Sequence, residues 1–137
     1  MENNVKDIIT LALQARKNSY APYSKFHVGA CLETNSGKFY TGCNIENAGY
    51  SATNCAERTA FFKAVSEGEK NFQRIAIMGG YEEDKLDFCP PCGVCLQVMM
   101  EFCNPDTFQI IVGNSKGKCK IYLLKELLPK GFGPANI

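Results

Sequence analysis

Cys55-Ala56-Glu57 and, further along the chain, Pro91-Cys92-Gly93-Val94-Cys95 are the two segments around which this sequence is organised. Each lies at the start of an expected helix, the first over residues 56–67 and the second over residues 92–103. A catalytic zinc ion takes three protein ligands and leaves its fourth position to water. The sequence therefore predicts one zinc ion per chain, with three thiolate ligands: Cys55, Cys92 and Cys95.

Glu57 stands two residues after the first cysteine, close enough to reach the outer shell of the metal without ligating it. A carboxylate in that place can take a proton from water and deliver it to a substrate. Taken alone, Glu57 would be a solvated glutamate that the helix dipole favours in a first turn. Together with the later Pro-Cys-x-x-Cys it matches the described signature of zinc-dependent deaminases, so we expect Glu57 to be the general acid and base.

Three thiolates leave a divalent zinc with excess negative charge, which would make its bound water less acidic. The N-termini of the two expected helices offset part of this charge, because they carry partial positive charge and unpaired amide donors. Arg58 lies one residue beyond Glu57 and is the candidate to add a full positive charge beside the sulfurs.

The other five of the eight cysteines need a separate interpretation. A structural zinc site is an alternative that avoids Cys55 and uses Cys89, Cys92, Cys95 and Cys103. However, Cys103 would lie about 12 Å from Cys95 along a helix that rises 1.5 Å per residue, so the two cannot share a metal. The remaining cysteines lie in apolar, strand-like runs and are expected to be small buried hydrophobic residues: Cys31, Cys43 and Cys119.

The chain of 137 residues suits a single domain, residues 1–137, that can bury a core without disulfides. Residues 1–18 show no pattern of a signal peptide, and no apolar run reaches the length of a membrane span. These features predict a cytoplasmic protein. With 15 basic and 14 acidic residues the net charge is +1, so no basic surface favours binding to nucleic acid.

Hydrophobic periodicity predicts an opening helix that ends near Asn18, followed by alternating strands and helices. A short turn between the last two strands makes them antiparallel, whereas strands separated by a helix should run parallel. We therefore expect an α/β fold with a mixed sheet flanked by helices, and strands over residues 28–34, 39–43, 72–78, 107–112 and 118–123.

Several further motifs resemble the small, homotetrameric cytidine deaminases. They run along most of the chain: Tyr20-Ala21-Pro22-Tyr23-Ser24-Lys25-Phe26, Asn44-Ile45-Glu46-Asn47-Ala48, Cys55-Ala56-Glu57-Arg58, Leu127-Leu128-Pro129 and Phe132-Gly133-Pro134. The resemblance implies hydrolysis of cytidine and deoxycytidine to uridine and deoxyuridine, with release of ammonia, in pyrimidine salvage. It also implies a three-layer α/β/α fold with five strands, and a tetramer whose subunits complete one another's active sites.

The same resemblance assigns substrate contacts by position. Asn44 and Glu46 would bind the ribose hydroxyls, and an amide with a carboxylate suits a sugar edge, although alone they read as polar turn residues. The remaining expected contacts are Phe26 against the nucleoside, the backbone of Ala56 at the pyrimidine edge, and Ala48, Tyr50 and Phe132 across subunit boundaries.

This sequence departs from the family pattern at two positions. Leu96 stands where the family usually has arginine, which would leave Arg58 with more of the charge compensation. His27 stands where proline is common; as a zinc ligand it would be redundant beside three cysteines.

Other functions remain open at this point. A deaminase of nucleotides would need basic residues near the ribose loop, and residues 41–53 contain neither lysine nor arginine. A nucleoside antibiotic is another possible substrate for the same chemistry. A structural zinc or redox module that binds a partner is the alternative from a different class, and its activity would survive the loss of Glu57.

Overall fold

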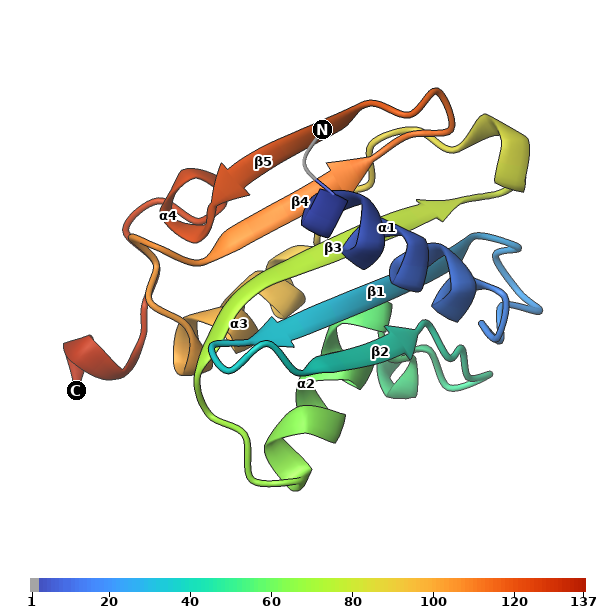
Figure 1. Cartoon of the computed structure of the whole chain (residues 1–137). Coiled ribbons are helices and arrows are strands. Elements are labelled where there is room, and N and C mark those ends of the chain that lie inside the picture. Colours follow the sequence, from blue (N-terminus) through green and yellow to red (C-terminus); the bar gives the residue numbers. More distant parts are fainter. Residues whose placement is uncertain (1–2) are drawn as a thin grey trace.

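A mixed five-stranded sheet forms the centre of the protein (Figure 1), as seen in a computed structural model that describes residues 3–137. The strands follow the order β2-β1-β3-β4-β5 across the sheet. Their bounds are β1 His27–Thr34, β2 Phe39–Cys43, β3 Phe72–Gly80, β4 Gln109–Gly113 and β5 Cys119–Leu123.

Strand directions agree with the expected mixed sheet. β1 pairs antiparallel with both β2 and β3, and β4 pairs antiparallel with β5. β3 and β4, which a helix connects, are parallel neighbours. β2 and β3 also run in the same direction, but β1 lies between them, so this second helical connection does not join adjacent strands.

Helices cover both faces of the sheet and complete the three-layer α/β/α fold. α1 (Asn3–Arg16) lies on one face, whereas α2 (Ala56–Ser66) and α3 (Gly93–Phe102) lie on the other (Figure 1). A short α4 (Leu124–Leu127) follows β5 directly. Three 3-10 turns complete the described elements: η1 Tyr50–Ala52, η2 Glu83–Lys85 and η3 Pro134–Asn136.

Two hydrophobic clusters fill the space between the layers. On the α1 side, Ile8 and Ala12 pack against Cys31 of β1. On the other side, Leu32 and the helices α2 and α3 enclose a larger cluster that contains Phe61 and Phe108. Because both faces of the central strands are covered, β1 and β3 are buried along almost their whole length instead of alternating between buried and exposed residues.

Two glycines allow the helices to lie close to the sheet. A Cβ atom at Gly29 would stand 2.0 Å from the carbonyl oxygen of Ala12 in α1. A Cβ atom at Gly42 would stand 2.5 Å from the carbonyl oxygen of Ala56, the first residue of α2. Gly42 therefore helps to fix the start of the helix that Cys55 precedes.

Some expected boundaries were wrong. The opening helix ends at Arg16, because Lys17 and Asn18 bond to carbonyls three residues back, as in a tightened last turn. Gly79 and Gly80 extend β3 instead of ending it, since they pair with Val28 and His27.

Of the three cysteines that were expected to be buried, two are not. Cys31 is buried as expected, but Cys43 and Cys119 are only half-buried because they lie in β2 and β5, the strands at the two edges of the sheet.

Within residues 3–137, no helix has both the length and the hydrophobicity needed to cross a bilayer. The expectation of no signal peptide concerned residues 1–18. Residues 1 and 2 of that segment lie outside the described residues.

Candidate active site

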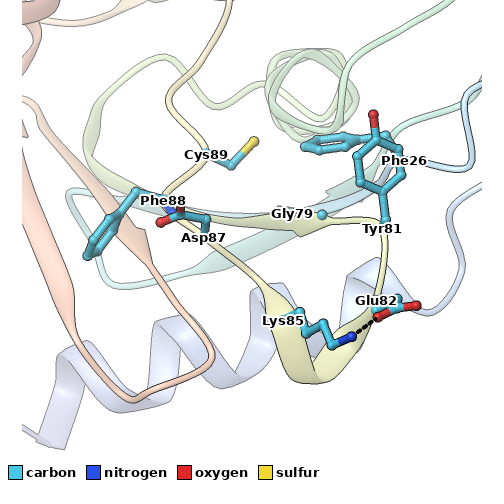
Figure 2. A pocket seen from close by; sticks show the side chains of 9 residues that line it. Phe26, Gly79, Tyr81, Glu82, Lys85, Asp87, Phe88 and Cys89 are labelled. Carbon is cyan, nitrogen blue, oxygen red and sulfur yellow. Dashed lines mark hydrogen bonds and ion pairs between the residues drawn. The ribbon is translucent and has the colours of Figure 1, made fainter.

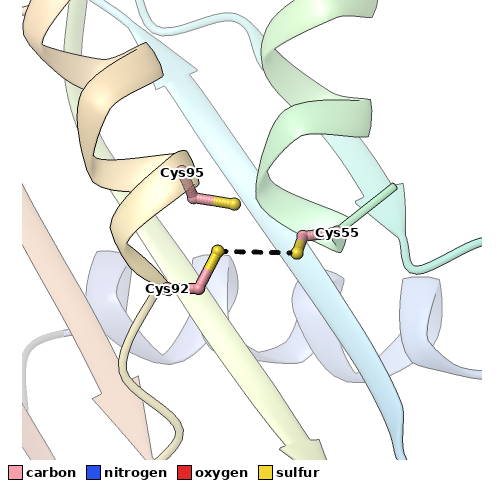
Figure 3. Close-up of side chains that lie close together, drawn as sticks. All are labelled: Cys55, Cys92 and Cys95. Carbon is pink, nitrogen blue, oxygen red and sulfur yellow. Dashed lines mark hydrogen bonds between the residues drawn. The ribbon is translucent and has the colours of Figure 1, made fainter. Parts of the chain in front are cut away.

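The starts of α2 and α3 bring three cysteines together. Cys55 and Cys92 are the N-cap residues of α2 and α3, and Cys95 lies in the first turn of α3. Their sulfur atoms all lie within 4.8 Å of one another, and the Sγ atoms of Cys55 and Cys92 are 3.7 Å apart (Figure 3). Among residues 3–137, this is the one cluster of three or more possible metal-ligating side chains.

This spacing fits a tetrahedral zinc ion. A zinc–sulfur bond of about 2.3 Å and tetrahedral angles put two sulfurs about 3.8 Å apart, which is close to the 3.7 Å between Cys55 and Cys92. Three cysteines leave a fourth position free, as in catalytic zinc sites. Cys103 caps the far end of α3 and does not belong to the cluster, in agreement with the sequence argument.

Arg58 supplies positive charge to the thiolates, as the sequence suggested. Its Nη2 donates a hydrogen bond to Cys55 Sγ over 3.2 Å. Hydrogen bonds from Cys95 and from Arg58, together with the charge of Arg58, lower the pKa of Cys55 to about 5. This lowered pKa favours the thiolate form of Cys55, which is the form that binds zinc.

Leu96, at the position where arginine was expected from the resemblance, is a residue of α3 that is buried in the core. The hydrophobic core accounts for an apolar side chain there, and Leu96 adds no charge to the site.

Glu57 lies in the first turn of α2 and is almost fully buried. Burial, together with the negative charge of Cys55, raises the pKa of its carboxyl group to about 7. A carboxyl group with a pKa near neutrality can both accept and release a proton at physiological pH.

A cavity of about 340 Å³ connects the thiolates and Glu57 with the expected ribose-binding residues. Six of the expected site residues besides Cys92 line it: Phe26, Asn44, Glu46, Cys55, Ala56 and Glu57. Cys92 also lines this cavity, which we call the substrate cavity, whereas Cys95 lies behind it and is buried.

Asn44 is held firmly at the wall of the substrate cavity. Its Oδ1 accepts a hydrogen bond from the backbone N–H of Val28 over 2.9 Å, and its Nδ2 donates to the carbonyl of Phe26 over 2.8 Å. These two bonds use one N–H and one lone pair of the amide, and one of each remains. Asn44 therefore orients the Phe26 segment and keeps limited capacity for a ligand.

Glu46 is positioned by the loop that precedes β1. Its carboxylate accepts hydrogen bonds from the backbone N–H groups of Tyr23 and Ser24, at 2.9 and 3.1 Å, and from the Ser24 hydroxyl. The Ser24 hydroxyl and these N–H groups hold the pKa of Glu46 below its usual value, so the group stays ionised. An ionised carboxylate with lone pairs to spare is a good acceptor for sugar hydroxyls.

Three of the expected substrate contacts lie outside the substrate cavity. Ala48, Tyr50 and Phe132 are exposed, and Tyr50 and Phe132 have 79% and 60% of their surface accessible. Tyr50 borders an adjoining cavity of about 360 Å³ that also includes Glu46. Their expected contribution to a neighbouring subunit's site remains a prediction.

His27 lies apart from the cysteine cluster. Its Nδ1 is 2.6 Å from the Ser19 hydroxyl, with which it shares a hydrogen bond. The structure thus gives this histidine a local partner in the loop before β1.

The sequence argument missed several residues that line the substrate cavity: Ser24, Val28, Thr53, Asn54, Cys89 and Pro90. The stiff Pro90-Pro91 pair was the one available signal, because it brings Cys89 to the wall just before the helix starts. The other four lie within two residues of Phe26 or Cys55 in the sequence, but the sequence argument gave them no role.

Comparison with known proteins gives a consistent result. A family model described as "Cytidine and deoxycytidylate deaminase zinc-binding region" matches residues 2–111. A cytidine deaminase of Sporosarcina psychrophila is 44% identical over 134 residues, which are 98% of this chain and 95% of the relative. A cytidine deaminase of Halalkalibacterium halodurans is 47% identical over 125 residues, which are 91% of each chain.

Solved structures agree with these relatives. The crystal structure of a cytidine deaminase from Burkholderia pseudomallei superposes with a TM-score of 0.84 at 42% identity. The match covers 96% of this chain and all of the other.

Proposed function

Since the chain belongs to the cytidine and deoxycytidylate deaminase family, we propose that it hydrolyses cytidine and deoxycytidine to uridine and deoxyuridine, with release of ammonia. It is a zinc-dependent hydrolase, and its role is in pyrimidine salvage. The observation that carries the choice of site is the substrate cavity, which joins Cys55 and Cys92 of the cysteine cluster and the buried Glu57 to Asn44 and Glu46.

We assign the zinc ion to Cys55, Cys92 and Cys95, with Arg58 offsetting their negative charge. When bound, zinc supplies the Lewis acidity that makes water a nucleophile near neutral pH. The low pKa of Cys55 keeps one ligand ready in its thiolate form before any metal arrives.

Glu57 moves the protons of the reaction. Its carboxylate accepts a proton from the attacking water and delivers it to the ring nitrogen beside the reacting carbon. A second proton, from the hydroxyl group added to that carbon, passes through Glu57 to the amino group, which leaves as ammonia. The raised pKa of Glu57 suits both the accepting and the donating step.

The sugar is placed by the other part of the cavity. Asn44 and Glu46 are already fixed by backbone groups, so binding the ribose requires little reordering of either side chain. Phe26 and the backbone of Ala56 line the space between the sugar and the thiolates.

The substrate class follows from charge. None of the residues lining the substrate cavity or the cavity beside Tyr50 is lysine or arginine. A phosphate group on the sugar would therefore meet Glu46 without a compensating cation. This supports a free nucleoside in preference to a nucleotide.

Assembly and location are further parts of the proposal. The exposed Tyr50 and Phe132 support a homotetramer in which neighbouring subunits cover one another's sites. Eight free cysteines, three of them needed as thiolates, support a reducing cytoplasmic location.

The test is an ultraviolet assay of the purified, zinc-loaded protein with cytidine and with cytidine monophosphate at equal concentration. We expect cytidine to be converted to uridine with one ammonia released for each uridine, and the monophosphate to react far more slowly. Absence of uridine and ammonia from a protein that retains its zinc would contradict the proposed function.

A further inference from the structure

A second cavity of about 470 Å³ lies beside the substrate cavity. The two cavities share two wall residues, Phe26 and Cys89. Figure 2 shows both residues in the wall of the second cavity. The second cavity is otherwise formed by the end of β3 and the segment that leads to Cys89, including Tyr81 and Phe88. Its function is not explained by the deamination site.

The position of Cys89 in this wall is well defined. A Cβ atom at Gly79 would lie 3.1 Å from Cys89 Sγ and 2.9 Å from a methyl group of Val28, so the thiol packs directly over the β3 backbone. A β-bridge between Gly79 and Asp87 ties the segment before Cys89 to the end of β3. The thiol is therefore held between the two cavities.

Phe26 is fixed in a similar way from the opposite side. Its ring packs edge-to-face on Tyr81, with ring centroids 5.0 Å apart and an interplanar angle of 85°. The carbonyl of Phe26 accepts the hydrogen bond from Asn44. Both shared wall residues are therefore held in place. The side chain of Cys89 is the smaller of the two.

The proposed reaction constrains how a cytosine ring lies in the substrate cavity. The amino-bearing carbon must face Glu57 and the thiolates, and the sugar must extend toward Asn44 and Glu46. Of the remaining lining residues, Ser24, Thr53 and Asn54 are polar, whereas Phe26, Val28, Cys89 and Pro90 form an apolar part of the wall, which we assign to the faces and the C5 edge of the ring. The C5 carbon adjoins the reacting carbon, on the side away from the nitrogen that Glu57 protonates.

We propose that Cys89 determines substrate specificity, because its thiol separates the C5 edge of the base from the second cavity and so limits the size of a C5 substituent. This inference depends on the proposed deamination. Once the thiol is removed, a large apolar substituent on C5 would enter the second cavity. The wall of that cavity beyond Cys89 includes Tyr81 and Phe88.

The experiment compares 5-iodocytidine with cytidine as substrates of the zinc-loaded protein. The measured quantity is the ratio of their kcat/KM values, because a general loss of folding or zinc affects both substrates alike. Cys89→Ala opens the wall and should raise this ratio about tenfold or more, which is the lower range for a methylene-sized change in a pocket. Cys89→Ser keeps the side-chain size and should leave the ratio within about threefold of the parent.

Cys89→Val fills more of the space and should lower the ratio. This variant tests the proposal with the opposite sign, so the proposal stays testable even if Cys89→Ala does not fold. Calorimetry with 5-iodouridine and uridine, which are not turned over, should show the same order of relative affinities. In crystals of Cys89→Ala with 5-iodouridine, anomalous scattering should place the iodine in the second cavity, beyond the position that the Cys89 thiol occupies in the parent.

A ratio within about twofold of the parent in both Cys89→Ala and Cys89→Val would overturn the inference, since pocket changes of this size normally alter specificity more. An iodine position away from the second cavity would overturn it as well. If the parent converts cytidine but the variants give either of these results, only the role of Cys89 is wrong. If the zinc-loaded parent converts neither nucleoside, the proposed function is wrong and the inference is rejected with it.

Discussion

At the scale of single residues, Glu57 is a carboxyl group buried beside a cluster of thiolates. Burial and the charge of Cys55 bring its pKa to about 7. A substitution that removes the ability of Glu57 to accept a proton, but keeps its size and burial, tests the proposed proton transfer by itself. Glu57→Gln does this, because an amide is nearly isosteric with a carboxyl group but is a poor base.

We expect zinc-loaded Glu57→Gln to keep the zinc content of the parent while kcat for cytidine falls by about 10² or more, the usual contribution of general acid–base catalysis. The matched control is Glu67→Gln, an exposed glutamate at the end of the same helix, which should leave kcat unchanged. A Glu57→Gln enzyme within about tenfold of the parent would show that Glu57 does not carry the protons.

Arg58 gives a second prediction at this scale. Its hydrogen bond to Cys55 helps to keep the sulfur as a thiolate. Arg58→Met should therefore weaken zinc affinity about 10- to 100-fold, as measured by competition with a chromophoric chelator. Arg58→Lys, which keeps the charge without the planar donor group, should fall between the parent and Arg58→Met. Equal zinc affinity in all three proteins would contradict this role.

The cysteines and Glu57 were predictable because their spacing is local and their chemistry is specific. Cys89 was considered only as a ligand of the alternative structural zinc site. Its place in the cavity wall depends on contacts with Gly79 and Val28, which are distant in sequence.

At the scale of elements, Arg16 links helix α1 to the strands that carry the cavity walls. Its Nε donates to the carbonyl of His27 over 2.9 Å, and its Nη2 donates to the carbonyl of Gly80 over 2.7 Å. His27 is the first residue of β1 and Gly80 is the last residue of β3. The buried side chain of Arg16 therefore holds together the two strand ends that adjoin Phe26 and Tyr81. Periodicity predicted the opening helix but could not identify these partners of Arg16.

Arg16→Met should destabilise the protein by about 1–3 kcal/mol, because two buried carbonyl groups lose their donors. Urea denaturation of the zinc-loaded protein measures this as a lower transition midpoint. The control is Lys17→Met, the exposed neighbour, which should stay close to the parent. If the midpoints of Arg16→Met and Lys17→Met coincide, Arg16 does not hold these strands.

The elements themselves were largely predictable, whereas their order in the sheet was not. Local periodicity identified the strands, and the short final turn gave the antiparallel pair β4 and β5. The insertion of β1 between β2 and β3 arises from pairing between distant segments. For the same reason the Gly79-Gly80 pair did not end β3.

At the scale of the whole molecule, the residues expected at subunit boundaries are exposed and absent from the substrate cavity. Phe132 is the clearest case, since its carbonyl is held by Gln97 of α3 over 2.7 Å while 60% of its surface remains accessible. This arrangement supports the proposed tetramer, in which Phe132 covers the site of a neighbouring subunit.

A mixing experiment tests this sharing. Phe132→Ala should raise KM for cytidine, and Glu57→Gln should abolish turnover. Subunits of the two variants, dissociated and reassembled together, should regain activity because some sites then combine an intact Glu57 with a neighbour's intact Phe132. Each variant reassembled alone is the control. No gain over the controls in confirmed mixed tetramers would mean that each chain builds its own site.

The central claim is that one zinc ion, bound by three cysteines at the starts of α2 and α3, makes this chain a deaminase. The most direct measurement is a zinc titration of metal-free, reduced protein while the conversion of cytidine to uridine is followed. We predict that turnover rises in proportion to bound zinc and saturates at one zinc per chain, and that Cys92→Ala gains no comparable activity. Turnover that is independent of zinc, or full turnover in Cys92→Ala, would contradict the account.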